Sequence, residues 1–453
     1  MNQLLTQPFP VEEQDFAELA DEIRVLLTGA VDTLEVAAGL EAKGIGDKTA
    51  HRYGQPDVFA LAARLYESTV RRPAFDRPAA NPWLTDEPTW RRGGRHVLRG
   101  LLFGLPGMGY VAAGPLLGRP SAGLVLTLAL VACWPLGQGL AALASSRPDP
   151  GAARSVLRYG VLAGTTAMAV ICVVFGALFG ADTAVVAVAC AQSLYLLAAT
   201  AALVTGGEIW LLAVLLPGLS VSFAGPPWQL VLAGWTVTGL GVLVLAYERT
   251  RDGTGTGVSW ASLRIAVPYA LFGLLAGGLL TFTIVAAYTG YGEPPPTTSI
   301  AMVALSLAMG PAEWVLYGFR ARGHDLLQES HSLQEFGWHI RVTLLELVVR
   351  FLAVLAVLLG LAFMVAEASR GTLQVAACSL LLGGALFVAL MLQSCGRATA
   401  SLVCCAVALV LETAALVLAA PPPVAVQLGG AAGLFTVLLA YAVVVLGRAT
   451  AHR

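Results

Sequence analysis

The chain has 453 residues, of which 57% are hydrophobic and 12% are charged, and its mean hydropathy is +0.75. This balance excludes a water-soluble globular protein and is typical of a chain that lies mostly in a lipid bilayer. A net charge of −1 gives no basic surface for phosphates, so no nucleic-acid partner is expected. The seven cysteines lie in or beside apolar stretches without metal-ligand spacing, and no cofactor or metal is expected.

Residues 1–96 are interpreted as a cytoplasmic helical head and linker. The first 90 residues hold 15 of the 28 acidic and 8 of the 27 basic residues. We expect one helix over 12–28, a second that begins after Asp32 as N-cap and ends at Gly44, and a third over 56–70 with one apolar face. Docking of a cytoplasmic synthase partner through residues 1–90 is one interpretation, and a solvated helical extension is the other.

From residue 97 onward, apolar stretches of membrane-spanning length follow one another with short loops between them. A helix needs roughly 20 apolar residues to cross the hydrocarbon core. Proline- and glycine-rich loops separate the stretches, since these residues end helices. Twelve spans are predicted, at 97–118, 121–145, 156–180, 183–204, 208–224, 228–247, 265–290, 297–319, 343–366, 371–394, 397–419 and 423–447.

The arginines between the spans predict the orientation. With both termini in the cytoplasm, 17 arginines fall in cytoplasmic segments, and only Arg119 and Arg370 fall in outer loops. Cytoplasmic loops retain cations, so we expect both termini inside a cell (inner, cytoplasmic) membrane. The polar loop 248–264 then divides the body into two six-helix halves, 97–247 and 265–453, a layout common in transporters built from repeats.

The segment 323–341, between the eighth and ninth spans, has helical periodicity with apolar residues on one face. Leu326, Leu333, Phe336 and Ile340 share a narrow arc, and Trp338 suits headgroup depth. We therefore expect one amphipathic helix here, lying along the cytoplasmic interface.

The distribution of histidine argues against enzymatic chemistry. All six histidines lie outside the predicted spans, which removes intramembrane acid–base catalysis by histidine and most membrane hydrolase schemes. The sequence therefore predicts a protein that is not an enzyme.

Ionisable residues inside the spans are few, and each is a candidate for function because burying a charge in lipid is costly. Glu412, in the eleventh span, is the clearest, as a hydrogen-bonding group between helices or as a proton- or cation-coupling group. Glu346 and Arg350 are spaced i to i+4 in the ninth span, where a snorkelling interfacial pair is the alternative. Glu313 follows Pro311, where a kinked helix would expose backbone groups to a cavity.

Uncharged polar and aromatic side chains complete the candidate cavity lining. Such groups stack on sugar rings and bond hydroxyls, although helix packing explains them equally well. They are Trp134 and Gln138 in the second span, and Gln192 and Tyr195 in the fourth.

Twelve spans in two halves, with proline-rich short loops and little fixed charge, resemble the multidrug/oligosaccharidyl-lipid/polysaccharide flippase superfamily. The segment 310–314, Gly-Pro-Ala-Glu-Trp, followed by the extension 320–341, is similar to Pel-type exopolysaccharide transporters. The resemblance covers 97–447 and implies an all-α polytopic membrane fold. It assigns no binding residues.

These observations lead to three functional hypotheses. The first is a transporter for polysaccharide or a lipid-linked saccharide that works by alternating access. The second is a non-transporting scaffold that holds an envelope-polysaccharide synthase through the head. The third is a small-molecule exporter, in which lipophilic cations pair with Glu412.

Overall fold

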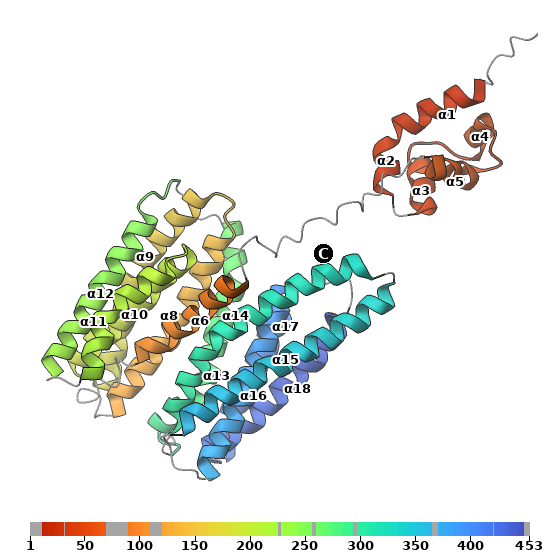
Figure 1. Cartoon of the computed structure of the whole chain (residues 1–453). Helices are drawn as coiled ribbons and strands as arrows, with labels where there is room; N and C mark the ends of the chain where they lie inside the picture. The colour runs from red at the N-terminus through yellow and green to blue at the C-terminus, as the bar shows by residue number, and fades with distance from the viewer. Residues whose placement is uncertain are drawn as a thin grey trace, which may run out of the picture. The chain divides into compact units, whose positions relative to one another are not determined.

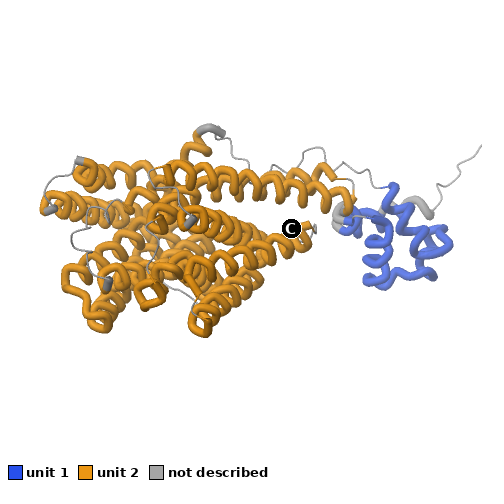
Figure 2. The backbone as a smooth tube through the Cα atoms, turned by 90° about the horizontal axis from the view of Figure 1, so that it is seen from below, with its two compact units in different colours: residues 1–81 blue, residues 82–453 orange. Residues whose placement is uncertain are grey.

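The computed structural model describes residues 11–30, 32–68, 89–107, 120–224, 228–255, 260–292, 297–330, 332–364, 370–419 and 421–447. In these ranges all regular secondary structure is helical, which confirms the all-α class (Figure 1). The chain forms two compact units, Met1–Asn81 and Pro82–Arg453 (Figure 2). The division falls earlier than residue 96, because the arginine-rich stretch after residue 89 is a helix of the second unit.

The head unit is a small helical domain with its own apolar core. Its helices are α1 (Val11–Glu22), α2 (Arg24–Gly29), α3 (Thr33–Ala42), α4 (Asp47–Ala50) and α5 (Val58–Ser68). Leu40 on α3 and Leu61 on α5 are fully buried in this core.

Two of the predicted helix boundaries in the head are confirmed. Asp32 accepts a hydrogen bond from the Glu35 N–H at 2.9 Å and so caps α3. Gly44, with φ of 81°, follows the end of α3. The single helix over 12–28 is wrong, because a turn at Ile23 separates α1 from α2 and places that side chain in the core, 1% exposed.

The second unit consists of long apolar helices. Ten are long and apolar enough to cross a membrane, and Glu208–Phe223 is a shorter apolar helix. The predicted spans from the second to the twelfth each match one helix; the first is described only as far as Gly107, and its remainder lies outside the described residues. The helices are α6 (Thr89–Gly104), η2 (Leu105–Gly107), α8 (Pro120–Ser145), α9 (Pro150–Phe179), α10 (Thr183–Val204), α11 (Glu208–Ala224), α12 (Trp228–Thr250), α13 (Trp260–Tyr288), α14 (Thr297–Glu329), α15 (Leu333–Phe363), α16 (Arg370–Ser394), α17 (Ala398–Ala419) and α18 (Pro423–Val445).

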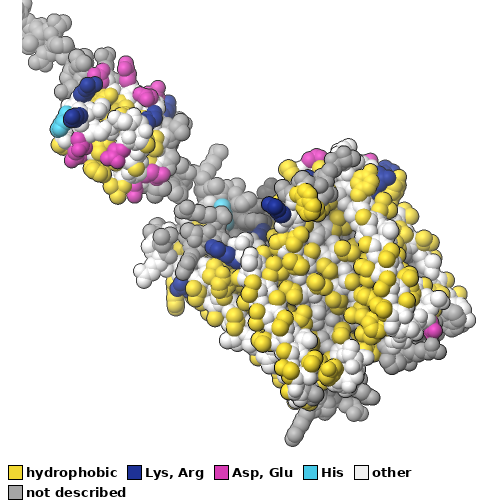
Figure 3. All heavy atoms as spheres, turned by 180° about the vertical axis from the view of Figure 1, so that it is seen from behind, with side chains coloured by type: hydrophobic (Ala, Val, Ile, Leu, Met, Phe, Trp, Pro, Cys, Tyr) yellow, Lys and Arg dark blue, Asp and Glu magenta, His cyan; other side chains and the backbone are white. Residues whose placement is uncertain are grey.

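The outer surface of this unit is apolar. Side chains such as Leu178, Val410 and Leu418 are 70%, 65% and 85% exposed, and hydrophobic atoms cover most of the face shown in Figure 3. Such a surface would be unfavourable in water but suits lipid, and helices pair most of their backbone groups within themselves, as a bilayer requires. The chain is therefore a polytopic helical membrane protein.

A single amphipathic helix over 323–341 is wrong, because two long helices meet there. α14 continues to Glu329, and α15 begins after Ser332, whose hydroxyl accepts the Glu335 N–H at 3.1 Å. The apolar side chains of the segment face protein instead of a membrane surface, since Phe336 and Ile340 are buried, while Trp338 is exposed.

Two arginines tie the α14–α15 pair to the rest of the second half. Arg341 Nε donates to the Val443 carbonyl of α18 at 3.2 Å, and Arg320 donates to the Ser394 carbonyl of α16. Both acceptors belong to the last turn of a helix, where a cation also offsets the helix dipole.

Each half has its own buried core, and among the described residues the halves meet mainly through two helix pairs. α6 of the first half packs on α14 of the second, and α8 of the first half packs on α13 of the second (Figure 1). α6 and α13 open their halves, and α8 and α14 are the next helices. Each pair therefore joins the first helix of one half to the second helix of the other half, so the two pairs are equivalent.

Candidate functional site

The α6–α14 contact is a close approach of two backbones. A Cβ placed on Gly100 would lie 2.6 Å from the Leu307 carbonyl oxygen and 3.2 Å from the Gly310 nitrogen. Pro311 lacks the N–H that would bond the Leu307 carbonyl within α14, and that carbonyl lies against Gly100. Glycine on both helices thus lets the halves pack without intervening side chains.

The α8–α13 contact uses the same chemistry. A Cβ on Gly273 would lie 3.1 Å from Gln138 Cγ and 3.2 Å from Pro135 Cα, and one on Gly277 would lie 3.5 Å from Trp134. Two predicted cavity residues, Trp134 and Gln138, therefore lie where the halves meet. As on α14, the helix that faces the glycines contains an internal proline.

A charged cluster lies beside the α6–α14 contact. It lies at the end of the unit where α6 and α11 begin, and we call this end of the unit the basic end. Arg99 of α6 donates to Glu208 at 2.7 and 2.9 Å and to Glu313 at 3.1 Å. His96, one turn earlier on α6, lies with Nδ1 3.3 Å from Glu313. We call His96, Arg99, Glu208 and Glu313 the interface cluster.

The interface cluster joins three helices and both halves. Glu208 starts α11 and is 5% exposed, which is unusual for a carboxylate unless it is paired. Glu313 lies on α14 of the second half. Next to them, the Arg92 guanidinium lies 5.0 Å from the Tyr317 ring centroid, so a cation–π contact between α6 and α14 adds to the ion pairs.

Glu412 lies deep in the second half, on α17. It is 2% exposed, and neither carboxylate oxygen has a hydrogen-bond partner. A Cβ on Gly430 of α18 would lie 2.7 Å from its Cδ, so this glycine makes the room that the carboxyl group occupies. An ionised, unpaired carboxylate is costly in such a place, and a proton or a cation would remove that cost.

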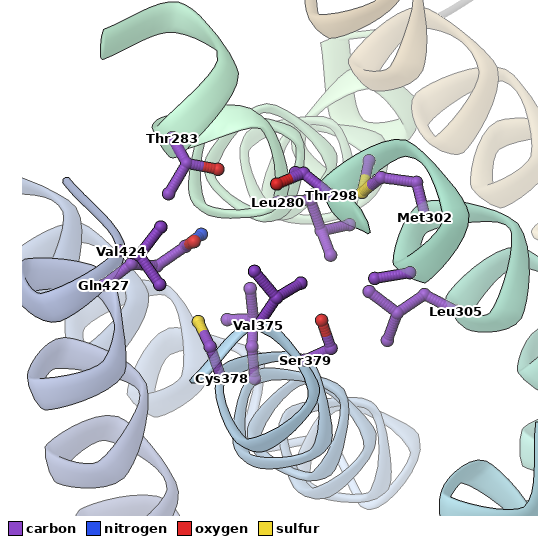
Figure 4. A pocket seen from close by; sticks show the side chains of 12 residues that line it. Leu280, Thr283, Thr298, Met302, Leu305, Val375, Cys378, Ser379, Val424 and Gln427 are labelled. Atoms are coloured by element: carbon purple, nitrogen blue, oxygen red, sulfur yellow. The ribbon is translucent and has the colours of Figure 1, made fainter. Parts of the chain in front are cut away.

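A small cavity lies in the second half, between α13, α14, α16 and α18 (Figure 4). Thr283, Thr298, Ser379 and Gln427 supply its polar lining, and the Thr298 hydroxyl is buried without a partner. Cys378, another lining residue, is near enough to Glu412 to interact with it electrostatically. The cavity has room for about one water-sized molecule.

The remaining predicted residues lie neither where the halves meet nor beside Glu412. On α10, the Gln192 amide and the Tyr195 hydroxyl are buried without hydrogen-bond partners inside the first half. Glu346 and Arg350 pair with each other at 2.5 Å on α15, where they are 52% and 63% exposed. The eight candidates therefore divide among the inter-half contacts, the interiors of the two halves and the outer surface.

Sequence reasoning missed Glu208 and the part that Arg99 plays. Arg99 contributed only to the predicted orientation, and Glu208 was included as the first residue of the predicted span 208–224 without a role of its own. The available signal was an acidic residue opening a short apolar helix, where a carboxylate also favours the helix N-terminus. Among the described residues, no three His, Cys, Asp or Glu side chains are grouped to hold a metal ion.

The fold and these contacts define a polytopic α-helical membrane protein with two packed halves. No family model matches the chain, and no curated protein matches it. Among solved structures it is similar to "MATE in the bent conformation", with 15% identity, a TM-score of 0.44 and coverage of 77% of this chain and 94% of that one. It is also similar to a MOP superfamily transporter from Pyrococcus furiosus, with 13% identity, a TM-score of 0.44 and coverage of 78% and 94%.

Proposed function

We propose that this protein is a membrane transporter that moves polysaccharide or a lipid-linked saccharide by alternating access of its two halves. The observation that carries the proposal is the pair of inter-half contacts, α6–α14 and α8–α13. The two contacts are equivalent, because each joins the first helix of one half to the second helix of the other. Two equivalent contacts are what a unit needs if its halves rock against each other about a central axis.

The chemistry of these contacts favours motion. Glycine surfaces present few interlocking side chains, so they separate and close again without repacking a core. The internal prolines Pro135 and Pro311 leave carbonyls without helical partners at the same contacts. Such carbonyls are tolerated in a membrane where they face protein or a water-filled space.

Uncharged polar and aromatic groups at the contacts support a saccharide as substrate. Trp134 offers a flat ring for stacking on a sugar, and Gln138 offers amide groups that pair with hydroxyls. Separation of α8 from α13 would expose both. The similarity of the segment 310–314 to Pel-type exopolysaccharide transporters points to the same substrate class.

Glu412 is proposed to couple transport to a proton or cation. If it does, Glu412→Gln should abolish export while expression and membrane insertion stay normal, because the amide keeps the shape but cannot exchange charge. The matched control is Glu248→Gln, since Glu248 pairs with Arg251 at the exposed end of α12. Normal export by a well-expressed Glu412→Gln protein would remove this role.

The test of the function as a whole is to measure surface polysaccharide and cell-associated lipid-linked saccharide in a deletion strain and in the complemented strain. Loss of surface polymer together with accumulation of the intermediate inside supports a transport step. Unchanged surface polymer rejects the saccharide proposal, and uptake and efflux of lipophilic cations would then be measured to test small-molecule export.

A non-transporting scaffold is separated from a transporter by removing the head. Because the compact head ends at Asn81, deletion of residues 1–81 leaves α6 and the remaining helices whole. A transporter should keep partial export without its head. A scaffold that acts through the head should lose its partner and show the same phenotype as the full deletion.

A further inference from the structure

We propose that the interface cluster is a latch between the halves, in which Arg99 stays bound to Glu208 and releases Glu313 when the basic end opens. The latch rests on the proposed function only in requiring that the halves move; it requires no particular substrate. Arg99 and Glu208 belong to the first half, and Glu313 belongs to the second. Opening therefore has to break the pair between Arg99 and Glu313, and it leaves the pair between Arg99 and Glu208 intact.

The geometry makes the two pairs unequal. Glu208 receives two hydrogen bonds from Arg99, at 2.7 and 2.9 Å, and its side chain is 6% exposed. Glu313 receives one from Arg99, at 3.1 Å, and its side chain is 33% exposed. Removing a buried carboxylate from the cation that it pairs with is far more costly than releasing one that water already reaches. Separation at Glu313 is therefore the less costly break.

Glu208 also keeps the open state accessible. Without it, Arg99 would lose its carboxylate partner whenever the halves part, and a bare guanidinium would remain among apolar helices. With it, Arg99 remains compensated in both states. Glu208 thus lowers the cost of opening, whereas Glu313 stabilises the closed state.

His96 adds a second contact of the same kind. It lies on α6, one turn from Arg99, and Nδ1 approaches the Glu313 oxygen that Arg99 also contacts. Both partners of Glu313 therefore come from one face of α6, beside the Gly100–Gly310 contact. Ionic and close-packed contacts lie side by side on α6 and α14, so one movement of α6 away from α14 breaks both.

The test is the distance between the halves at the basic end, measured by double electron–electron resonance on the full chain in liposomes. Spin labels are placed at Arg154→Cys on the first half and Arg397→Cys on the second, both exposed, after the native cysteines are replaced. Glu313→Gln should increase the open population about tenfold, because a charge-assisted hydrogen bond between the halves is lost. Glu208→Gln should shift the population the other way, toward the closed state.

The opposite signs distinguish a latch from a merely structural cluster. Glu248→Gln, at the same end but within one half, should leave the distances unchanged. Equal distances in wild type and Glu313→Gln, or the same direction of shift in Glu313→Gln and Glu208→Gln, would overturn the latch. If the two variants shift the open population in opposite directions but the deletion strain makes normal surface polymer, the latch is supported and the saccharide function is rejected. If no variant changes the distances between the spin labels but the deletion abolishes export, the function is supported and the latch is rejected.

Discussion

Gly100→Ala should drive α6 and α14 apart, because the added methyl has no room. Its Cβ would lie 2.6 Å from the Leu307 carbonyl oxygen and 3.3 Å from Gly310 Cα, whereas ordinary contact begins at 3.4 Å. The obstacles are backbone atoms of a helix, which do not rotate away. Relief of the shortest contact requires a shift of about 0.8 Å, and overpacking of this kind costs about 1–3 kcal/mol.

The same shift acts on the interface cluster, since Arg99 is the neighbour of Gly100. A shift of that size along the hydrogen bond from Arg99 to Glu313, 3.1 Å long, would carry it past the limit of hydrogen bonding at about 3.5 Å. The gain in helix propensity from glycine to alanine, about 1 kcal/mol, offsets part of this cost. We expect the closed population to fall about tenfold relative to a control with the same propensity gain.

Gly94→Ala is that control, because it lies on the same helix and nothing lies within 4 Å of an added Cβ. The assay is the distance between spin labels at Arg154→Cys and Arg397→Cys, as for the interface cluster. Identical distance distributions in Gly100→Ala and Gly94→Ala would refute the claim that glycine contacts set the separation of the halves.

Two further predictions concern stability. Asp32→Ala should destabilise the head by about 1 kcal/mol through loss of the α3 cap on Glu35, seen as faster amide exchange in α3 of the full chain, with exposed Glu41→Ala as the control. If both variants exchange alike, the cap contributes nothing. Leu355→Ala, in the fully buried core of the second half, should cost about 2–5 kcal/mol and lower the Tm in detergent. Leu361→Ala, at a 60% exposed position on the same helix, should barely change the Tm, and equal losses at both positions would contradict the core placement.

The positions of the second to twelfth spans along the chain could be predicted because they depend on local properties. Proline and glycine end helices wherever they occur, and apolar length is counted along the chain. The prediction for the segment 323–341 was wrong because it, too, used only local properties. Its periodicity was real, but periodicity does not say whether the apolar face meets lipid or protein, and Phe336 meets the core of the second half.

The interface cluster could be predicted only in part because its pairs are distant in sequence. Glu313 stood out as an acidic residue in an apolar helix. Its partner Arg99 is 214 residues away, and Glu208 is 109 residues from Arg99. The local pair of Glu346 and Arg350, by contrast, followed directly from helical spacing, and the structure contains it. Glu412 was also identified from the sequence, whereas its fit against Gly430 required the packing of α17 on α18.

The arginine contacts of α14 and α15 bear on how many parts of this protein move independently. Because Arg320 and Arg341 fasten these helices to the ends of α16 and α18, α14 is not free to tilt alone. A displacement at Glu313 must then carry the fastened helices with it. The second half should therefore respond as one cooperative body with a single degree of freedom, and intermediate positions of individual helices should be scarce.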